Sequence, residues 1–399
     1  MKHTLKALIA LLMLAAVLLT AAVTFSICYI SIWNSFDARL AVLSEREAEF
    51  AKLSEIDAYL SEYYIMDGLD RAALVEGAAE GMVAALPDGW SYYMTAEEYA
   101  ASRDSSADDF VGIGVMAYFD GAAGLRVTEV YTDSPAHKAG VRFFDLITRV
   151  DGRDTLEMGS EAAFDAVRGE EGTDVVLTVF RASTGETLEI TVTRGRITEH
   201  ELQSELLEDG IGYIRISGFS ENVDLQFRSA VEELTRQGAR SLIFDVRFNP
   251  GGQLDVLTNM LDLLLPEGTI IRWVDKDGNE GSVSSDKDCV RLPMVVLAHE
   301  YSYSAAEFFA AALQEYGAAQ VVGMKTTGKC FAQSTYKLSD GSAIAISTLQ
   351  YTTPQGRSLG GVGITPDHEV ALSYEQTVNF ATLPFDEDPQ MQKAMELLK

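Results

Sequence analysis

The stretch PMVVLAHEYSYSAAEFFAAALQEYGAAQVVGMKTTGKCFAQ, residues 293–333, decides the fold of this chain. Its apolar opening, residues 293–298, is typical of a strand, and residues 305–316 have helix-forming composition with apolar residues at helical spacing. Residues 317–323 predict another strand. Ser304 lies at the turn from strand to helix, where a hydroxyl is exposed and neighbouring amides can bind an oxyanion. Lys329 follows the later strand, and it is the candidate base that a serine nucleophile needs.

The surrounding sequence continues this alternation of strand and helix over residues 210–367. Apolar strand-like runs such as GIGYIRIS and SLIFDVR are separated by helical segments such as NVDLQFRSAVEELTRQG. Alternation of this kind predicts an α/β core with parallel strands, and Asp340-Gly341 predicts the turn of a later hairpin. The tail, residues 372–399, shows no functional motif, and we expect it to be peripheral.

Residues 110–197 have a different pattern of short strands, including VGIGVMAYF, LRVTEVY and TLEITVTRG, with SPAHKAGV and SEAAFDAVRG as short helical pieces. This stretch resembles a PDZ domain. The resemblance implies that Gly112, Ile113 and Gly114 form a loop whose backbone N–H groups bind the terminal carboxylate of a peptide, while a strand edge pairs with the peptide. The alternative is a glycine bulge that only starts a strand.

The N-terminal third is predicted to be helical. Residues 7–33 carry no charge and follow Lys2 and Lys6, so we expect residues 1–33 to form a single-pass membrane anchor, with the rest of the chain on the extracytoplasmic side. A cleaved signal peptide stays possible, because small residues such as Ala21 lie within the run. Residues 34–105 predict a helical segment, with a polar boundary at 103–109.

Composition limits the classes of function. A length of 399 residues suggests two or three domains, and the formal net charge of −29 argues against a nucleic-acid partner. The three cysteines are Cys28, Cys289 and Cys330. The sequence leaves open whether Cys289 and Cys330 form a disulfide. The five histidines show no metal spacing, and we expect neither a metal nor an organic cofactor.

The chain resembles the C-terminal processing peptidases, also called tail-specific proteases, in its longest motifs. These peptidases carry a serine in S-x-S-A-x-E, a lysine in T-x-G-K twenty-five positions later and a glutamine four positions beyond the lysine. Ser304, Lys329 and Gln333 occupy these positions with the same spacing. The segments SLIFDVRFNPGG and YTTPQGRSLGGVGITPD extend the resemblance. Departures are Cys330 for a usual glycine, His299 for a usual asparagine, and a reversed Asp-Pro at residues 87–88.

The resemblance implies roles for the matching residues. Ser304 would be the nucleophile, Lys329 its general base and Gln333 the holder of the lysine amine. The oxyanion hole would be formed by the amides of Ala305 and of Gly251 or Gly252. Four residues of a straight strand span about 13 Å, so Gln333 reaches Lys329 only if the chain bends between them. Substrates would be proteins or peptides with free C-termini, and a homo-oligomer is possible.

Several alternatives compete for the same residues. Ser304 and Glu307 also fit a helix capping box, and residues 323–329 fit most of a phosphate-binding loop, although Cys330 replaces its Ser or Thr and the following residues favour a strand. A Ser304–His299 pair or a Cys330 thiolate nucleophile is conceivable.

The favoured fold is therefore α/β, with a transmembrane helix (1–33), a helical segment (34–105), a β-rich PDZ-like domain (110–197), an α/β Ser/Lys protease core (198–371) and a tail (372–399). The favoured function is a membrane-anchored serine endopeptidase, and the alternative is a catalytically silent PDZ scaffold.

Overall fold

The computed structural model describes residues 2–104, 109–131, 134–198, 201–380 and 383–399. The chain divides into two compact units, residues 1–77 and 78–399. The first unit holds helix α1 (Lys2–Tyr63) and the start of helix α2 (Arg71–Ala84), in agreement with the prediction that the N-terminal third is helical. Arg71 joins the two helices through Asp57 at 3.0 Å and Ser61 at 2.6 Å. Over the described residues, no helix has a stretch that is both long and apolar enough to span a membrane.

The second unit begins with a short N-terminal part. It contains strand β1 (Tyr92–Met94) and helix α3 (Ala96–Asp104). β1 is not an isolated strand, because it pairs antiparallel with β18 (Ala343–Thr352), far away in the sequence. Residues from the predicted helical segment are therefore part of a sheet whose other strands lie in the C-terminal half of the chain.

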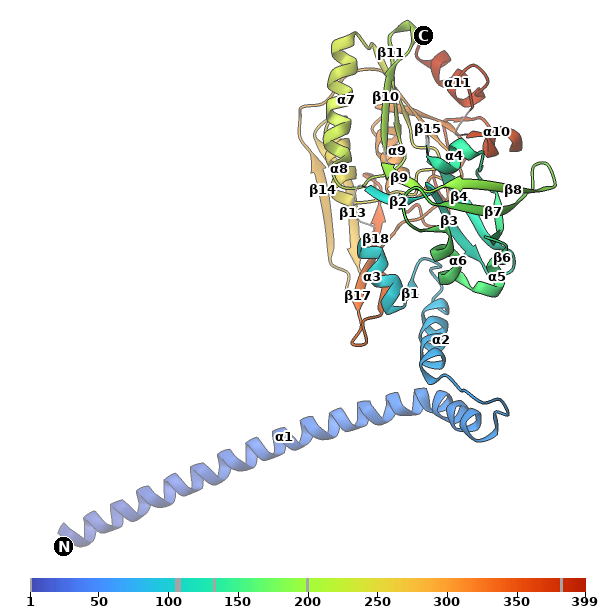
Figure 1. Ribbon diagram of the computed structural model, residues 1–399. Coiled ribbons are helices and arrows are strands. Elements are labelled where there is room, and N and C mark those ends of the chain that lie inside the picture. Colours follow the sequence, from blue (N-terminus) through green and yellow to red (C-terminus); the bar gives the residue numbers. More distant parts are fainter. Residues whose placement is uncertain (1, 105–108, 132–133, 199–200, 381–382) are drawn as a thin grey trace. The chain divides into compact units, whose positions relative to one another are not determined.

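A β-rich domain follows, as the PDZ-like pattern predicted. A five-stranded path runs in the order β3-β4-β5-β7-β8, β6 pairs with β5, and a separate pair joins β2 to β9. β3 is the end strand of this path, so its outer edge faces away from the sheet (Figure 1). The elements are β2 (Asp109–Gly112), β3 (Val115–Asp120), β4 (Gly124–Val130), α4 (Pro135–Ala139), β5 (Leu146–Val150), β6 (Arg153–Asp154), α5 (Thr155–Met158), α6 (Ser160–Val167), β7 (Asp174–Arg181), β8 (Glu186–Thr193) and β9 (Gly195–Thr198).

The α/β core is built on a six-stranded sheet in the order β10-β11-β12-β15-β16-β19. All neighbouring pairs from β11 to β19 are parallel, and only β10 is antiparallel to β11, so the predicted α/β core is confirmed. The elements are β10 (Leu202–Leu206), the short 3-10 helix η1 (Glu208–Gly210), β11 (Ile211–Ile216), α7 (Val223–Gln237), β12 (Ser241–Asp245), α8 (Leu254–Asp262), β15 (Met294–Ala298), α9 (Ala305–Glu315), β16 (Ala319–Gly323) and β19 (His368–Glu369).

Helices cover both faces of this sheet (Figure 1). Phe227 of α7, Leu261 of α8 and Phe309 of α9 pack with the sheet residues Ile214, Phe244 and Val296 in one buried cluster. The alternate sheet residues, among them Ile243 and Val295, point to the other face. There they pack with Met391 and Ala394 of helix α11 (Pro389–Leu397). Burial on both faces explains why the central strands are continuous apolar runs.

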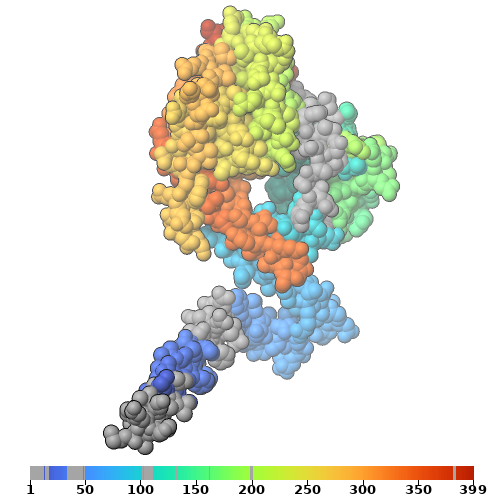
Figure 2. Space-filling view, turned by 90° about the vertical axis from the view of Figure 1, so that its left-hand side faces the viewer, coloured from blue at the N-terminus to red at the C-terminus, as the bar shows by residue number. Residues whose placement is uncertain are grey.

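A second, antiparallel sheet flanks the core, and only its hairpin was predicted. Its order is β1-β18-β13-β14, with β17 paired to β18, where β13 is Gly268–Asp275, β14 is Glu280–Ser285 and β17 is Phe331–Lys337. The predicted turn at Asp340 and Gly341 joins β17 to β18. Figure 2 shows this hairpin as an orange projection from the surface.

The tail is part of the core, contrary to the expectation that it is peripheral. Besides helix α10 (Tyr374–Val378), it contributes Asp388, which is 1% exposed and caps helix α11. Asp388 accepts a hydrogen bond of 2.6 Å from the buried Arg247. Gln390 accepts another from the same guanidinium at 3.0 Å. The helical pattern of the tail is too short to reveal these long-range contacts.

Candidate active site

The nucleophile candidate lies at the end of the central strand β15. Ser304 is the N-cap of α9 and has φ 59° and ψ −123°, a backbone conformation that is strained for a residue other than glycine. Such strain persists only where surrounding contacts hold it. Ser302 provides one of them: its buried hydroxyl donates to Val246 O at 2.7 Å and accepts from His299 N at 2.9 Å. Ser302 therefore anchors the loop, and Ser304 stands at the helix N-terminus.

Glu307 links the serine and lysine loops. Its fully buried carboxylate accepts hydrogen bonds from Ser304 N at 3.0 Å and Lys329 N at 2.8 Å. It also accepts from Thr326 Oγ1 at 2.5 Å and Gly328 N at 2.7 Å. Burial raises the pKa of Glu307, and these hydrogen bonds oppose the rise. The capping motif identified the contact to Ser304, whereas nothing in the sequence indicated the three contacts to the lysine loop.

Lys329 follows a turn that requires glycine. Gly328 has φ 92°, and a Cβ there would lie 2.8 Å from Leu359 O. Burial lowers the pKa of the Lys329 amine. Within the described part of the chain the amine makes no hydrogen bond; it lies 4.6 Å from the ring centre of Trp90 and 5.8 Å from that of Tyr303. Catalytic hydrogen bonds often tighten only when substrate is bound.

Gln333 lies close to the lysine loop, and the bend required to bring it there is present. The pairing of β17 with β18 shifts register between Ala332 and Gln333, which is the irregularity of a β-bulge. The Gln333 side-chain amide donates to Phe331 O and to Ser347 Oγ, both at 3.1 Å. Its hydrogen-bond partners in this structure therefore do not include Lys329.

The two glycines of the Asn-Pro-Gly-Gly turn differ in their contacts: the Gly251 amide is hydrogen-bonded within the turn, and Gly252 lines a cavity. Gly251 lies against the nucleophile, since a Cβ there would be 2.7 Å from Ser304 Cβ, but its N–H donates to Asn249 Oδ1 at 2.7 Å. Gly252 lines a cavity of about 370 Å³ together with Ser304 and Ala305. As the first residue of α9, Ala305 has an N–H without an intrahelical acceptor.

The same cavity collects most of the predicted catalytic residues. Lys329 and Gln333 line it together with Ser304, Ala305 and Gly252, so five of the six predicted residues of the protease core meet there. Its remaining wall is largely apolar: Leu254, Leu257, Ile271, Phe308, Phe331, Ala332 and Tyr351, with Pro250.

The predicted carboxylate-binding loop lies in the β-rich domain. Gly112 ends β2, and Ile113 is 2% exposed in the core of that domain. Gly114 has φ 78°, and a Cβ there would lie 2.3 Å from Ser134 Cβ. Gly114 is thus required by the fold itself. The edge strand β3 starts directly after it.

The competing hypotheses find less support. His299 is fully buried and stacks on Phe248 at 4.5 Å, and burial lowers its pKa to about 4; it does not line the cavity. Cys330 is 1% exposed and also lies outside the cavity lining. All three cysteines are free. The residues after Lys329 form strand β17 where a phosphate-binding loop would open a helix.

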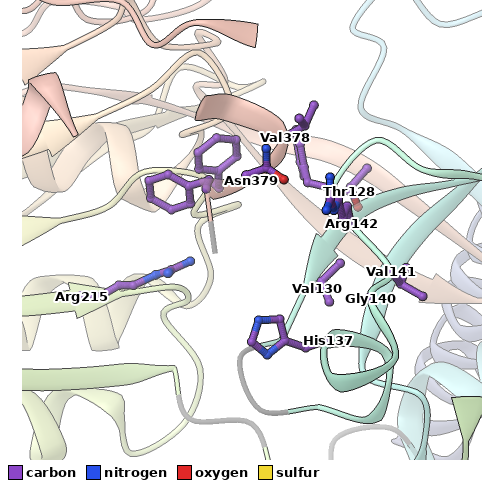
Figure 3. A pocket seen from close by; sticks show the side chains of 12 residues that line it. Thr128, Val130, His137, Gly140, Val141, Arg142, Arg215, Val378 and Asn379 are labelled. Atoms are coloured by element: carbon purple, nitrogen blue, oxygen red, sulfur yellow. The ribbon is translucent and has the colours of Figure 1, made fainter. Parts of the chain in front are cut away.

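The site borders a contact between the β-rich domain and the core. Phe143 packs against Phe248 at 5.0 Å and Tyr301 at 5.5 Å. Phe248 lies three residues before Gly251, and Tyr301 three residues before Ser304. Beside these rings is a pocket of about 210 Å³, into which Arg215 extends from the core and His137 from the β-rich domain (Figure 3). The sequence patterns did not indicate this contact.

Comparison with known proteins agrees with the site. Residues 210–370 match the model of peptidase family S41, residues 126–181 a PDZ domain, and residues 32–98 the N-terminal domain of the activating protease CtpB. A probable CtpA-like serine protease of Staphylococcus haemolyticus is 31% identical over 92% of this chain and 73% of that protein. A carboxyl-terminal-processing protease of Synechocystis is 32% identical over 85% of this chain and 80% of that protein.

A solved structure leads to the same class. The photosystem II D1 C-terminal processing protease superposes with a TM-score of 0.63 at 26% identity, covering 87% of this chain and 90% of that one. The fold and the site thus define a serine-type peptidase with a PDZ domain. The chain belongs to the S41 family of C-terminal processing peptidases.

Proposed function

We propose that this protein cleaves other proteins near their C-termini through Ser304 and Lys329. The observation that carries the proposal is the shared cavity, which is lined by Ser304, Lys329 and Gln333 together with Gly252 and Ala305. The neutral Lys329 amine would take the proton of the Ser304 hydroxyl as its oxygen attacks the scissile carbonyl. The leaving amine then departs with a proton from Lys329, and water hydrolyses the acyl-enzyme.

The oxyanion of this reaction would be bound by Ala305 N–H and Gly252 N–H. Gly252 is the better candidate of the glycine pair, because the amide of Gly251 is already bonded to Asn249. Two flanking bonds fix its position, Phe219 N to Gly251 O at 3.0 Å and Gln253 N to Phe219 O at 2.7 Å. Removing one such donor typically costs about 3–4 kcal/mol of transition-state stabilisation.

The test compares two serines two residues apart. Ser304→Ala is expected to abolish cleavage of an unfolded protein and labelling by a fluorophosphonate probe. Ser302→Ala is expected to lower stability by about 1–3 kcal/mol, because it removes two buried hydrogen bonds, yet to keep a nucleophile that the probe labels. Equal activity of wild type and Ser304→Ala would exclude the Ser304 mechanism. Unlabelled wild type would favour the silent scaffold.

The PDZ domain is proposed to capture the substrate tail. Among the described strands β3 pairs only with β4, so its other edge suits addition of a peptide strand, and the turn at Gly112 and Ile113 lies at its start. Binding of a free-acid peptide to full-length Ser304→Ala should be about ten- to a hundred-fold tighter than binding of its amidated form. Equal affinities would exclude carboxylate recognition. Gly114 is unsuitable for this test, since a side chain there would clash with Ser134.

We further propose that residues 1–33 anchor the protein in the cell membrane, with the peptidase on the extracytoplasmic side, on the strength of the charge-free run at 7–33. Extraction of full-length and truncated protein from membranes with alkaline carbonate tests this. A homo-oligomer is supported by apolar side chains on the first unit, such as Ile65 at 96% and Tyr63 at 67% exposure. Sedimentation of the soluble fragment tests the oligomer.

A further inference from the structure

The amine of the candidate base lies against an aromatic ring from a distant part of the chain. Lys329 Nζ is 4.6 Å from the ring centre of Trp90, and the ring of Tyr303, next to Ser304, is 5.8 Å away on the same amine. The two rings are themselves 5.9 Å apart at 30°. A cation over a ring face at such distances is attracted to it, and the ring also displaces water from the amine.

The turn that carries Trp90 is well fixed. Both oxygens of the Asp88 carboxylate are used: Trp90 N and Ser91 N donate to one at 2.9 Å, and Ser91 Oγ donates to the other at 2.8 Å. Strand β1 follows at once and pairs with β18. Burial would raise the pKa of Asp88, but hydrogen bonds from Ser347 and from this turn lower it to about 2. The carboxylate is therefore ionised at neutral pH.

The same turn also reaches Gln333. Ser91 Oγ accepts the backbone N–H of Ser347 at 3.1 Å, and the hydroxyl of Ser347 accepts from the Gln333 amide at 3.1 Å. One turn, residues 88–91, therefore contacts Lys329 through a ring and Gln333 through two serines. Two independent connections to the base side of the cavity are unexpected for a turn that serves only to connect secondary structures.

We propose that Trp90 is a positioning residue for the catalytic base. Its ring holds the amine of Lys329 at the cavity and shields it from water, so the turn at residues 88–91 completes the active site. This proposal rests on the proposed role of Lys329. It assigns a function in catalysis to a segment that precedes the PDZ domain in the sequence.

The ring has two opposing effects on the protonation of Lys329. Attraction to the ring face favours the ammonium form, whereas loss of water favours the neutral amine. Burial lowers the pKa of Lys329, and the ring of Trp90 contributes to that burial, so the expected shift rests on the loss of water. The other titratable groups around the lysine are Glu307, which accepts its backbone N–H, Tyr303 beneath the amine, Tyr351 on the cavity wall and Asp88 in the turn.

The decisive measurement is kcat/KM against pH for full-length variants acting on an unstructured peptide. Trp90→Ala admits water to the amine, so the midpoint of the rise with pH should move up by about one unit, which is about a tenfold loss at neutral pH that is regained in alkali. Trp90→Phe keeps a ring and should keep the midpoint. KM should change little, since Trp90 does not line the cavity.

Two controls keep the outcome clear. Tyr92→Ala alters an exposed side chain of the adjoining strand and should leave the pH profile unchanged. If Trp90→Ala does not fold, Trp90→Gln keeps part of the bulk at this partly buried position, brings a polar group to the amine and should shift the midpoint in the same direction. An equal loss at every pH, or no loss, in a folded variant would overturn the proposal. Failure of the Lys329 mechanism itself would appear separately, as activity retained in Lys329→Arg.

Discussion

A lysine that acts as a base must lose its proton, and the surroundings of Lys329 determine the pH at which it does. The side chain is partly buried against aromatic rings, and no carboxylate forms an ion pair with it among the described residues. Burial without a counter-charge lowers the pKa of a lysine. Gln333 was expected to hold the amine, but here it binds Ser347, so rings take the place of the expected amide in this structure.

The first prediction at this scale concerns Lys329→Arg. Arginine keeps the positive charge but does not deprotonate in proteins, so the variant should be nearly inactive. The wild type should gain activity with rising pH as the neutral amine forms, with a midpoint below the usual value for lysine. Peptide hydrolysis across the pH range measures both. Lys325→Arg, an exposed residue of the same loop, is the matched control, and normal activity of Lys329→Arg would show that another group is the base.

The second prediction concerns Glu307→Gln. The carboxylate accepts four hydrogen bonds, and an amide in its place presents an NH₂ group to two of those donors. Each unsatisfied buried donor costs about 1–3 kcal/mol, and the serine and lysine loops lose their common anchor. Urea unfolding should show the lower stability and kcat should fall. Glu267→Gln, at an exposed position, should change neither the stability nor kcat. A Glu307→Gln variant that is as stable and as active as the wild type would contradict the role of Glu307 as the anchor of the two loops.

Among the elements, the turn before β17 fixes the position of Lys329. Gly328→Ala would place a Cβ 2.8 Å from Leu359 O at φ 92°, so the turn must move and shift Lys329. We expect a large loss of kcat. Gly356→Ala separates backbone strain from the clash, because Gly356 has a similar φ of 80° with no atom within 4 Å. Its cost should be about 1 kcal/mol of stability without loss of kcat; similar kcat in both variants would contradict this account.

The elements also show what the sequence could predict. The apolar runs of β12 and β15 and the amphipathic helix α7 are local patterns, and they predicted the α/β core correctly. The spacing of Ser304, Lys329 and Gln333 predicted a common site only because it matches the motif of a known family. The three residues do line one cavity. Contacts between distant segments were missed, because no periodicity records them: Trp90 on Lys329, and Asp388 on Arg247.

At the scale of the whole molecule, one charged network joins the tail to the residues that follow strand β12. Arg247 is 2% exposed; it donates to Asp245 at 2.9 and 2.6 Å and to Asp388 at 2.6 Å, and its guanidinium lies 4.6 Å from the ring centre of Phe380. The next residues are Phe248 and Asn249, which lead into the Asn-Pro-Gly-Gly turn. The tail thus contacts, through Arg247, the segment that leads into the Asn-Pro-Gly-Gly turn.

The fourth prediction follows from this network. Asp388→Ala leaves Arg247 with a single buried counter-charge and should cost about 3–5 kcal/mol of stability, with a lower kcat for the fraction that remains folded. Asp388→Asn keeps an acceptor and should cost less. Chemical denaturation and active-site titration measure the two effects. Asp386→Ala, which changes an exposed residue two positions earlier, is the control. If Asp388→Ala and Asp386→Ala are equally stable, the Asp388 carboxylate does not contribute to stability.

The position of Asp388 in the chain also sets the order in which this network can form during synthesis. A ribosome adds Ser304 and Lys329 before it adds Asp388, so a growing chain already contains the nucleophile and the base while Arg247 still lacks its second carboxylate. Because Arg247 lies two residues before Asn249, which begins the Asn-Pro-Gly-Gly turn, we expect this part of the core to reach its full stability only after residue 388 has been added.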